Sequence, residues 1–298
     1  MRLPDFLVIG AAKAGTTTIF EYLCKHPQVF IPHWKEVSFF ALDHLYGRGL
    51  EWYASCFSDA GPNQVCGEAS TRYSRLEQHP KTLERMVPVL KDPKFIYILR
   101  HPVDRAYSFY VYRFKGAKHK PELAVPDTFE ETIETVDEFL DSSNYMAQIE
   151  RYLQYYPRES FLFLLMEDLI RDPAGVMGQI FSFIGVDDQV DVVGATPIAS
   201  NKASDYPEWY VQSQLLEPIK SLPLVQEVSK AFPKDLRQNL RNSVYKVLKK
   251  YRYRQWAEEQ YLPPPMRPET RQMLLERFEE PNRRLSEFLG RDLSHWSK

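Results

Sequence analysis

The sequence predicts an α/β protein with a mostly parallel central sheet flanked by helices, followed by a helical C-terminal part. Three observations predict this class. Apolar runs of strand length alternate with segments of helical period up to about residue 184. The first run ends in a glycine turn that leads directly into a helix. After about residue 205 the pattern is helical and contains no clear strand. The alternation predicts helices on both faces of the sheet.

Turn and cap residues set the limits of each element. Gly10 ends the first strand, and Pro27 lies beyond the first helix. Pro102 suits the first turn of the helix after the fourth strand, and Asp127 caps the next helix. The predicted strands cover residues 6–9, 28–31, 64–67, 95–99 and 161–165. The predicted helices cover residues 16–25, 77–90, 102–115, 128–140, 144–155 and 173–184.

The stretch FLVIGAAKAGTTTIFEYL, residues 6–23, predicts a phosphate cradle. Such a turn directs several backbone N–H groups at one point, where the positive end of the helix dipole adds to the field. Lys13 adds a cation, and three threonine hydroxyls add donors. The turn resembles the P-loop pattern G-x-x-x-x-G-K-[ST], because Gly10 and Gly15 have its spacing. Thr16 stands where that pattern has lysine, which argues against hydrolysis of ATP or GTP.

A second motif, FIYILRHPVDRAYSFY over residues 95–110, predicts a second anion site. Arg100 lies at the carboxyl end of a strand, where α/β sheets bind ligands. Ser108 follows two turns into the next helix. The arginine fork and the serine hydroxyl could therefore hold a second phosphate. The alternatives are a salt bridge between elements for Arg100 and a helix-surface position for Ser108.

The bulk composition excludes several classes. The chain of 298 residues has a formal net charge of −2, so no general basic field indicates nucleic-acid binding. It contains no apolar run long enough for a membrane span and no visible signal peptide. We therefore expect a cytoplasmic protein, or a catalytic piece of a larger one. Cys24, Cys56 and Cys66 lack metal-ligand spacing and, being three, cannot all form disulfides, so a reduced compartment is the simplest interpretation. No linker is visible, so residues 1–298 are predicted to form a single domain.

Together the two motifs resemble the sulfotransferases that use 3′-phosphoadenosine 5′-phosphosulfate (PAPS). The segments HPQVFIPHWKEVSFF and EPNRRLSEFLGRDLSHW are similar to the heparan-sulfate-type enzymes and their bacterial relatives. The resemblance covers roughly residues 5 to 297. It implies transfer of a sulfuryl group from PAPS to an acceptor hydroxyl, in line and without a metal. The implied acceptor is a carbohydrate, with an alkyl or carrier-bound hydroxyl as the second choice.

The resemblance also implies which residues bind PAPS. The first motif would hold the 5′-phosphosulfate, and Arg100 with Ser108 the 3′-phosphate. The loop over residues 186–206 would close over the nucleotide, which makes Asn201 and Lys202 candidate contacts. A solvated loop lysine is the alternative for Lys202. The residues predicted for the first motif are Lys13, Ala14, Gly15, Thr16, Thr17 and Thr18.

Glu36 is the predicted catalytic base, and Lys13 the cation for the leaving phosphate. Glu36 matches the glutamate base of the heparan-sulfate-type enzymes. Burial beside Trp34, Phe39 and Phe40 could bring its pKa toward the working pH. A surface carboxylate paired with Lys35 is the alternative. His33 is the rival base, because the small-molecule branch of the family uses a histidine.

The chain departs from the heparan-sulfate pattern at Ala69, where those enzymes carry a catalytic lysine after the glutamate. The nearest cation in the sequence is Arg72, and Glu68 is expected to hold the local loop. The departure puts a heparan-type substrate in doubt and leaves sulfuryl transfer intact. The residues predicted to contact the acceptor are His33, Lys35, Arg72 and Tyr145.

Two other functions remain as alternatives. Glu167 and Asp168 follow an apolar strand, which is also typical of a metal-binding strand end in a P-loop kinase. A magnesium requirement would favour that interpretation. The second alternative is a nucleotide-binding protein without catalysis, which Ala69 alone favours. Binding of the product nucleotide PAP without turnover would support it.

Overall fold

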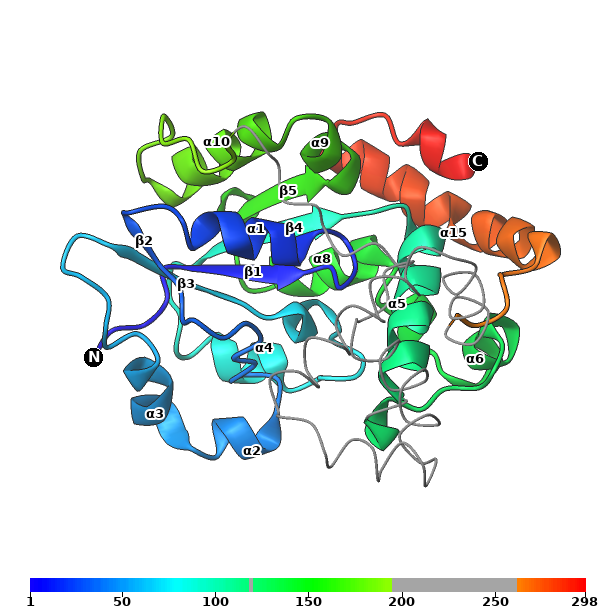
Figure 1. The fold of residues 1–298 in the computed structure, drawn as a ribbon, viewed down its shortest axis with the longest axis horizontal. Coiled ribbons are helices and arrows are strands. Elements are labelled where there is room, and N and C mark those ends of the chain that lie inside the picture. Colours follow the sequence, from blue (N-terminus) through cyan, green and yellow to red (C-terminus); the bar gives the residue numbers. More distant parts are fainter. Residues whose placement is uncertain (118–119, 195–261) are drawn as a thin grey trace, which may run out of the picture. The chain divides into compact units, whose positions relative to one another are not determined.

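The computed structural model describes residues 1–117, 120–194 and 262–298 (Figure 1). Its centre is a five-stranded sheet in the order β2-β3-β1-β4-β5, and all four neighbouring pairs are parallel. This confirms the predicted α/β class and all five predicted strands. The strands are β1 (Phe6–Gly10), β2 (Val29–Phe30), β3 (Val65–Ala69), β4 (Lys94–Leu99) and β5 (Phe161–Leu165).

Helices cover the sheet on both faces, and Figure 1 shows α1 in front of the strands and α8 behind them. The α-helices in the described parts of the chain are α1 (Thr16–Leu23), α2 (Asp43–Tyr46), α3 (Gly49–Ser55), α4 (Thr82–Met86), α5 (Pro102–Ala117), α6 (Phe129–Thr135), α7 (Glu138–Asp141), α8 (Tyr145–Leu153), α9 (Met166–Arg171), α10 (Pro173–Ile184) and α15 (Pro268–Leu289). Short 3₁₀ turns accompany them: η1 (Thr71–Ser74), η2 (Pro121–Leu123), η3 (Arg158–Ser160) and η4 (Ser294–Ser297).

Two of the predicted helices are shorter in the structure than the sequence pattern indicates. The helix expected over 77–90 is only α4, because Pro80 precedes it and Pro88 lacks the N–H that would continue it. The helix expected over 128–140 is split into α6 and α7. The backbone bond from the Val136 N–H to the Thr132 carbonyl, at 2.9 Å, is the last of α6, and α7 begins anew after its N-cap Asp137. Helices α2, α3 and α9 were not predicted.

The chain divides into two compact units. The larger comprises Met1–Tyr110, Phe129–Ser200 and Met266–Lys298, and it contains the whole sheet. The smaller comprises Val111–Thr128 and Asn201–Pro265. The single domain expected over residues 1–298 stays a prediction. In the larger unit every β1 residue is buried, so the strand reads as a continuous apolar run, as parallel strands do.

All three cysteines lie in the described residues as free thiols, with Cys24 exposed and the other two buried. Among the helices that the structure describes, none combines the length and the apolar composition needed to cross a bilayer.

Candidate active site

The loop between β1 and α1 is the segment for which a phosphate cradle is predicted. Gly15 caps the helix with a φ of 96°, and Lys13 also lies in the left-handed region with a φ of 71°. The cap contributes no side-chain hydrogen bond. The backbone N–H groups at the start of α1 therefore keep their capacity to bind an anion. Thr16 and Thr18 are buried, whereas Thr17 is exposed.

The loop is fixed by backbone hydrogen bonds. The Ala11 N–H donates to the Ile98 carbonyl of β4 at 2.7 Å, and the Ala14 N–H donates to the Ala11 carbonyl at 3.2 Å. The Ala14 amide is thus used within the turn itself. Ala14 is fully buried, so its contribution to the cradle is the shape of the loop.

Arg100 joins the two motifs of the sequence. Its Nη1 donates to the Lys13 carbonyl at 3.0 Å, across 87 residues of chain. Burial lowers the pKa of Lys13, and the nearby charges of Arg100 and Lys35 lower it further. Cations gathered in this way repel one another, and a bound anion would relieve that repulsion. The electrostatics of this loop are therefore suited to an anion.

Tyr145, predicted to contact the acceptor, is instead 1% exposed at the start of α8. Its hydroxyl donates to the Arg100 carbonyl at 2.7 Å. This placement favours a role in holding Arg100 over contact with an acceptor. Ser108 lies on α5 and is 7% exposed.

Lys35 connects the cradle to the predicted base. Its Nζ donates to Thr16 Oγ1 at 3.0 Å and to Thr17 Oγ1 at 3.3 Å, both in the first turn of α1. The same Nζ lies 3.5 Å from Oε1 of Glu36. Burial lowers the pKa of Lys35, and Glu36 acts in the opposite direction. One ammonium group therefore lies between the phosphate loop and a carboxylate.

Glu36 is held from several sides. The Thr71 N–H donates to its Oε2 and the Thr71 hydroxyl to its Oε1, each at 3.0 Å. Arg72 Nη1 lies 3.7 Å from its Oε2. Its side chain is 28% exposed, so it can still be reached from solvent. The alternative interpretation, an ion pair with Lys35, is therefore present in the structure together with these other contacts.

The surroundings of Glu36 differ from the expectation. Phe39 and Phe40 belong to the core, whereas Trp34 is 42% exposed. His33 is also exposed, and its ring meets that of Trp34 edge-on at 4.4 Å. Trp34 and His33 thus present an aromatic surface next to the candidate base. Two further aromatic residues nearby in the sequence are less accessible, since Tyr53 is buried and Trp52 half-buried.

Thr71 is a residue that the sequence did not single out, and Lys35 has a contact that the sequence did not predict. Thr71 makes two hydrogen bonds to Glu36, and Lys35 bridges to α1. Parallel strands end at one edge of a sheet, so the chain after β3 and the chain after β2 had to meet. That rule, applied to the segment TRYS, could have singled out Thr71. Asn201 and Lys202 lie outside the described residues.

Glu167 and Asp168 are engaged by the C-terminal tail. Glu167 Oε1 accepts from Trp296 Nε1 at 2.9 Å and lies 2.7 Å from His295 Nε2. Asp168 pairs with Arg291 and Arg171, each at 2.5 Å. These contacts favour a structural role for Glu167 and Asp168, which tie α9 to the C-terminal tail, over a metal-binding strand end.

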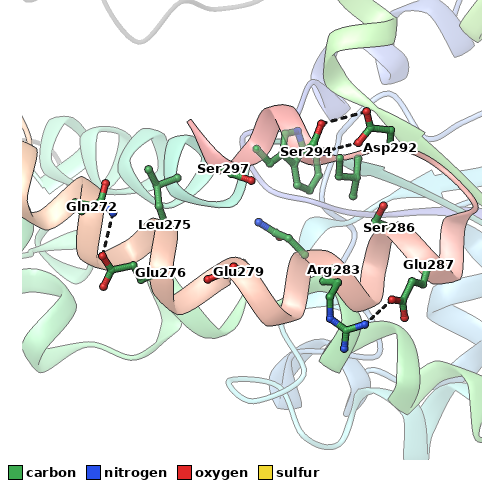
Figure 2. Close-up of a pocket in the computed structure, with 13 residues that line it drawn as sticks. Gln272, Leu275, Glu276, Glu279, Arg283, Ser286, Glu287, Asp292, Ser294 and Ser297 are labelled. Atoms are coloured by element: carbon green, nitrogen blue, oxygen red, sulfur yellow. Dashed lines mark hydrogen bonds and ion pairs between the residues drawn. The ribbon is translucent and has the colours of Figure 1, made fainter.

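The α15 helix and the tail enclose a groove of about 570 Å³ (Figure 2). Figure 2 shows that charged side chains on its wall pair with each other, as Arg283 does with Glu287. None of the residues that line the groove belongs to the predicted site.

The family described as the sulfotransferase domain matches residues 3–251. The chain belongs to the sulfotransferase family. The similar proteins include human heparan sulfate glucosamine 3-O-sulfotransferase 6, which is 31% identical over 188 residues, 62% of this chain and 53% of that protein. Human bifunctional heparan sulfate N-deacetylase/N-sulfotransferase 3 is 34% identical over 205 residues, 62% of this chain and 22% of that protein. The sulfotransferase chain thus spans about half, or less, of these relatives' length.

Among solved structures, a sulfotransferase from Alicyclobacillus acidocaldarius matches with a TM-score of 0.65 and 24% identity, over 100% of both chains. At this identity the likeness supports the sulfotransferase fold alone.

Proposed function

We propose that this chain transfers a sulfuryl group from PAPS to a hydroxyl of a carbohydrate. The main support for the proposal is the pair of contacts made by Lys35 Nζ, which we call the Lys35 bridge. This ammonium group contacts Thr16, next to the loop between β1 and α1, and also the carboxylate of Glu36. Donor and base therefore belong to one site. Family membership and the cationic cluster of Lys13, Lys35 and Arg100 support the same conclusion.

The roles follow from the chemistry of the transfer. The acceptor oxygen forms a bond to sulfur while the bond from sulfur to the 5′-phosphate oxygen breaks. Glu36 takes the proton of the acceptor hydroxyl. Lys13 and the N–H groups of α1 stabilise the charge that grows on the leaving phosphate. Arg100 and Ser108 bind the 3′-phosphate.

Lys35 and Arg72 are the cations that we propose in place of the lysine absent at Ala69. Both lie within 4 Å of Glu36, at 3.5 Å and 3.7 Å. Lys35 also contacts the first turn of α1, so it can act on the transferring group. The catalytic charge would then come from two sides of the site, from Lys35 after β2 and from Arg72 in η1 after β3.

Two observations support a carbohydrate acceptor. The relatives are named as heparan sulfate enzymes. Trp34, 42% exposed beside His33, offers an aromatic face on which a sugar ring can stack. The sulfation position and the glycan are best found by a screen of heparan-type and neutral oligosaccharides.

Calorimetric titration with PAP, and separately with ATP and magnesium, tests the donor site. We expect metal-independent PAP binding in the wild type. The Arg100→Ala variant should bind PAP about 10- to 100-fold more weakly, as for loss of a charge-assisted contact. Arg171→Ala, on the exposed side of α9, is the control and should bind normally. Binding of ATP but not of PAP would overturn the proposal in favour of a phosphotransferase.

A further inference from the structure

A buried carboxyl group lies beneath the candidate base. Glu68 on β3 is 1% exposed, and its carboxyl accepts three side-chain hydrogen bonds. The hydroxyls of Tyr53 and Tyr73 donate to Oε1 at 2.7 Å and 2.6 Å. The hydroxyl of Ser70 donates to Oε2 at 3.1 Å. Burial of a carboxylate is costly, and these three donors offset part of the cost.

Ser70 carries this network to the loop of Glu36. Its Oγ accepts from the Ser38 N–H at 2.9 Å. Glu36 and Ser38 have φ values of 67° and 54°, in the left-handed region that residues with a side chain rarely adopt. Such a backbone persists only where its surroundings hold it. The Ser70 hydroxyl is one such support.

The chain that follows Glu68 supplies the remaining supports. The Ala69 carbonyl accepts from the Glu36 N–H at 2.9 Å, and Thr71 donates twice to the Glu36 carboxylate. Arg72 Nη1 donates to Ser38 Oγ at 3.2 Å. The end of β3 and the turn η1 therefore form a frame around Glu36, and Glu68 anchors that frame to the core.

Burial raises the pKa of Glu68 from its usual 4.5 to about 7, and the hydrogen bonds from Tyr73, Tyr53 and Ser70 act in the opposite direction. The group therefore remains partly ionised near neutral pH. In its ionised form it accepts all three hydrogen bonds.

We propose that Glu68 is a positioning residue that orients Glu36 for proton removal, through Ser70 and the backbone of Ser38. The inference rests on the proposed function, in which Glu36 is the base. Glu68 touches neither substrate nor nucleotide in this role. Its effect should therefore fall on kcat and on the order of the loop at Glu36, and should leave nucleotide affinity unchanged.

The test compares Glu68→Gln, Tyr53→Phe and Ser70→Ala with the wild type. Tyr156→Phe is the matched control, because its buried hydroxyl donates to the Leu90 carbonyl at 3.2 Å, outside the network. In the three network variants we expect faster exchange of the Glu36 and Ser38 amides, by about 10-fold or more. We expect kcat to fall roughly 10-fold while PAP affinity stays within about twofold, since the effect is on the chemical step. The control should change none of these.

Glu68→Ala adds a rescue comparison. The amide oxygen of glutamine can still accept from both tyrosines, so Glu68→Gln should retain more activity than Glu68→Ala. Unchanged amide exchange and kcat in both Glu68→Gln and Ser70→Ala would overturn the proposal. Equal losses of kcat and PAP affinity would also overturn it, because they indicate general destabilisation. If the wild type sulfates no acceptor, the proposed function fails, and amide exchange alone still decides whether Glu68 holds the loop.

Discussion

At the scale of single residues, Glu36 combines exposure with restraint. Its carboxylate accepts two hydrogen bonds from Thr71 and lies within 4 Å of two cations, at 3.5 Å and 3.7 Å. A base must be held at one position and still be reached by the acceptor. The hydrogen bonds from Thr71 hold the Glu36 carboxylate at one position, and its exposed fraction of 28% leaves it accessible to an acceptor.

Removal of the base should affect chemistry alone. The Glu36→Gln variant should lose about 100-fold or more in kcat, because glutamine cannot accept the proton. Its PAP affinity should stay near that of the wild type. Lys13→Ala should lose both turnover and PAP affinity, because Lys13 belongs to the phosphate loop. Steady-state kinetics with PAPS and titration with PAP separate the two effects.

Glu51→Gln is the control for Glu36→Gln, because Glu51 is an exposed carboxylate on α3. It should leave both kcat and PAP affinity unchanged. Near-normal turnover of Glu36→Gln on a good acceptor would remove Glu36 as the base, and His33 would then be the next residue to replace.

At the scale of elements, strand ends create the site. The cradle follows β1, Glu36 follows β2, Thr71 follows β3 and Arg100 follows β4. In a parallel sheet these four ends lie at the same edge. The sequence motifs predicted the positions after β1 and β4, and the family resemblance predicted Glu36 after β2. Thr71 was missed because a threonine in a turn carries no signal of its own.

The contact between α9 and the C-terminal tail yields a second prediction at this scale. Glu167 accepts from Trp296 and His295, and its side chain is 35% exposed. Glu167→Ala should lower the free energy of unfolding by about 1 kcal/mol, because a half-exposed acceptor contributes modestly. PAP affinity should not change. Urea denaturation and PAP titration, with or without magnesium, measure the two.

Glu159→Ala is the control for that change, because Glu159 is exposed in η3. It should leave the free energy of unfolding as in the wild type. Loss of nucleotide binding in Glu167→Ala, in a protein that needs magnesium to bind, would contradict the structural role. It would instead favour the phosphotransferase.

At the scale of the whole molecule, the buried Glu68 couples stability to pH. Its pKa rises from 4.5 to about 7 on folding, so between these values the folded state binds more protons than the unfolded state. The free energy of unfolding therefore falls as pH rises through this window. The full contribution is about 3 kcal/mol.

Glu68→Gln should remove this contribution. From pH 4.5 to pH 8, the free energy of unfolding of the wild type should therefore fall relative to that of Glu68→Gln, by up to about 3 kcal/mol. Urea denaturation across this range measures it. The pKa of His79 is lowered to about 4 by burial, which gives the opposite slope, but His79 is present in both proteins and cancels. Parallel pH profiles would show that Glu68 does not titrate in this window.

The sequence by itself determined the class of the fold and the five strands, and it predicted two anion-binding motifs. Each depends on local information: apolar runs, glycine and proline positions, and charged residues at strand ends. It also pointed to Glu36 through the family resemblance. Helix ends were less determined, since α4 is shorter than predicted and α6 and α7 stand in place of one predicted helix.

Only the tertiary structure decided how these parts meet. The Lys35 bridge, the Arg100 contact with Lys13 and the frame around Glu36 join residues far apart in the chain. The exposure of two residues differed from the prediction for the same reason. Tyr145, expected at the acceptor, is buried with its hydroxyl on the Arg100 carbonyl, and Trp34, expected to be buried, is exposed. Burial and hydrogen-bond partners depend on what packs from other elements. No pattern within one segment contains that information.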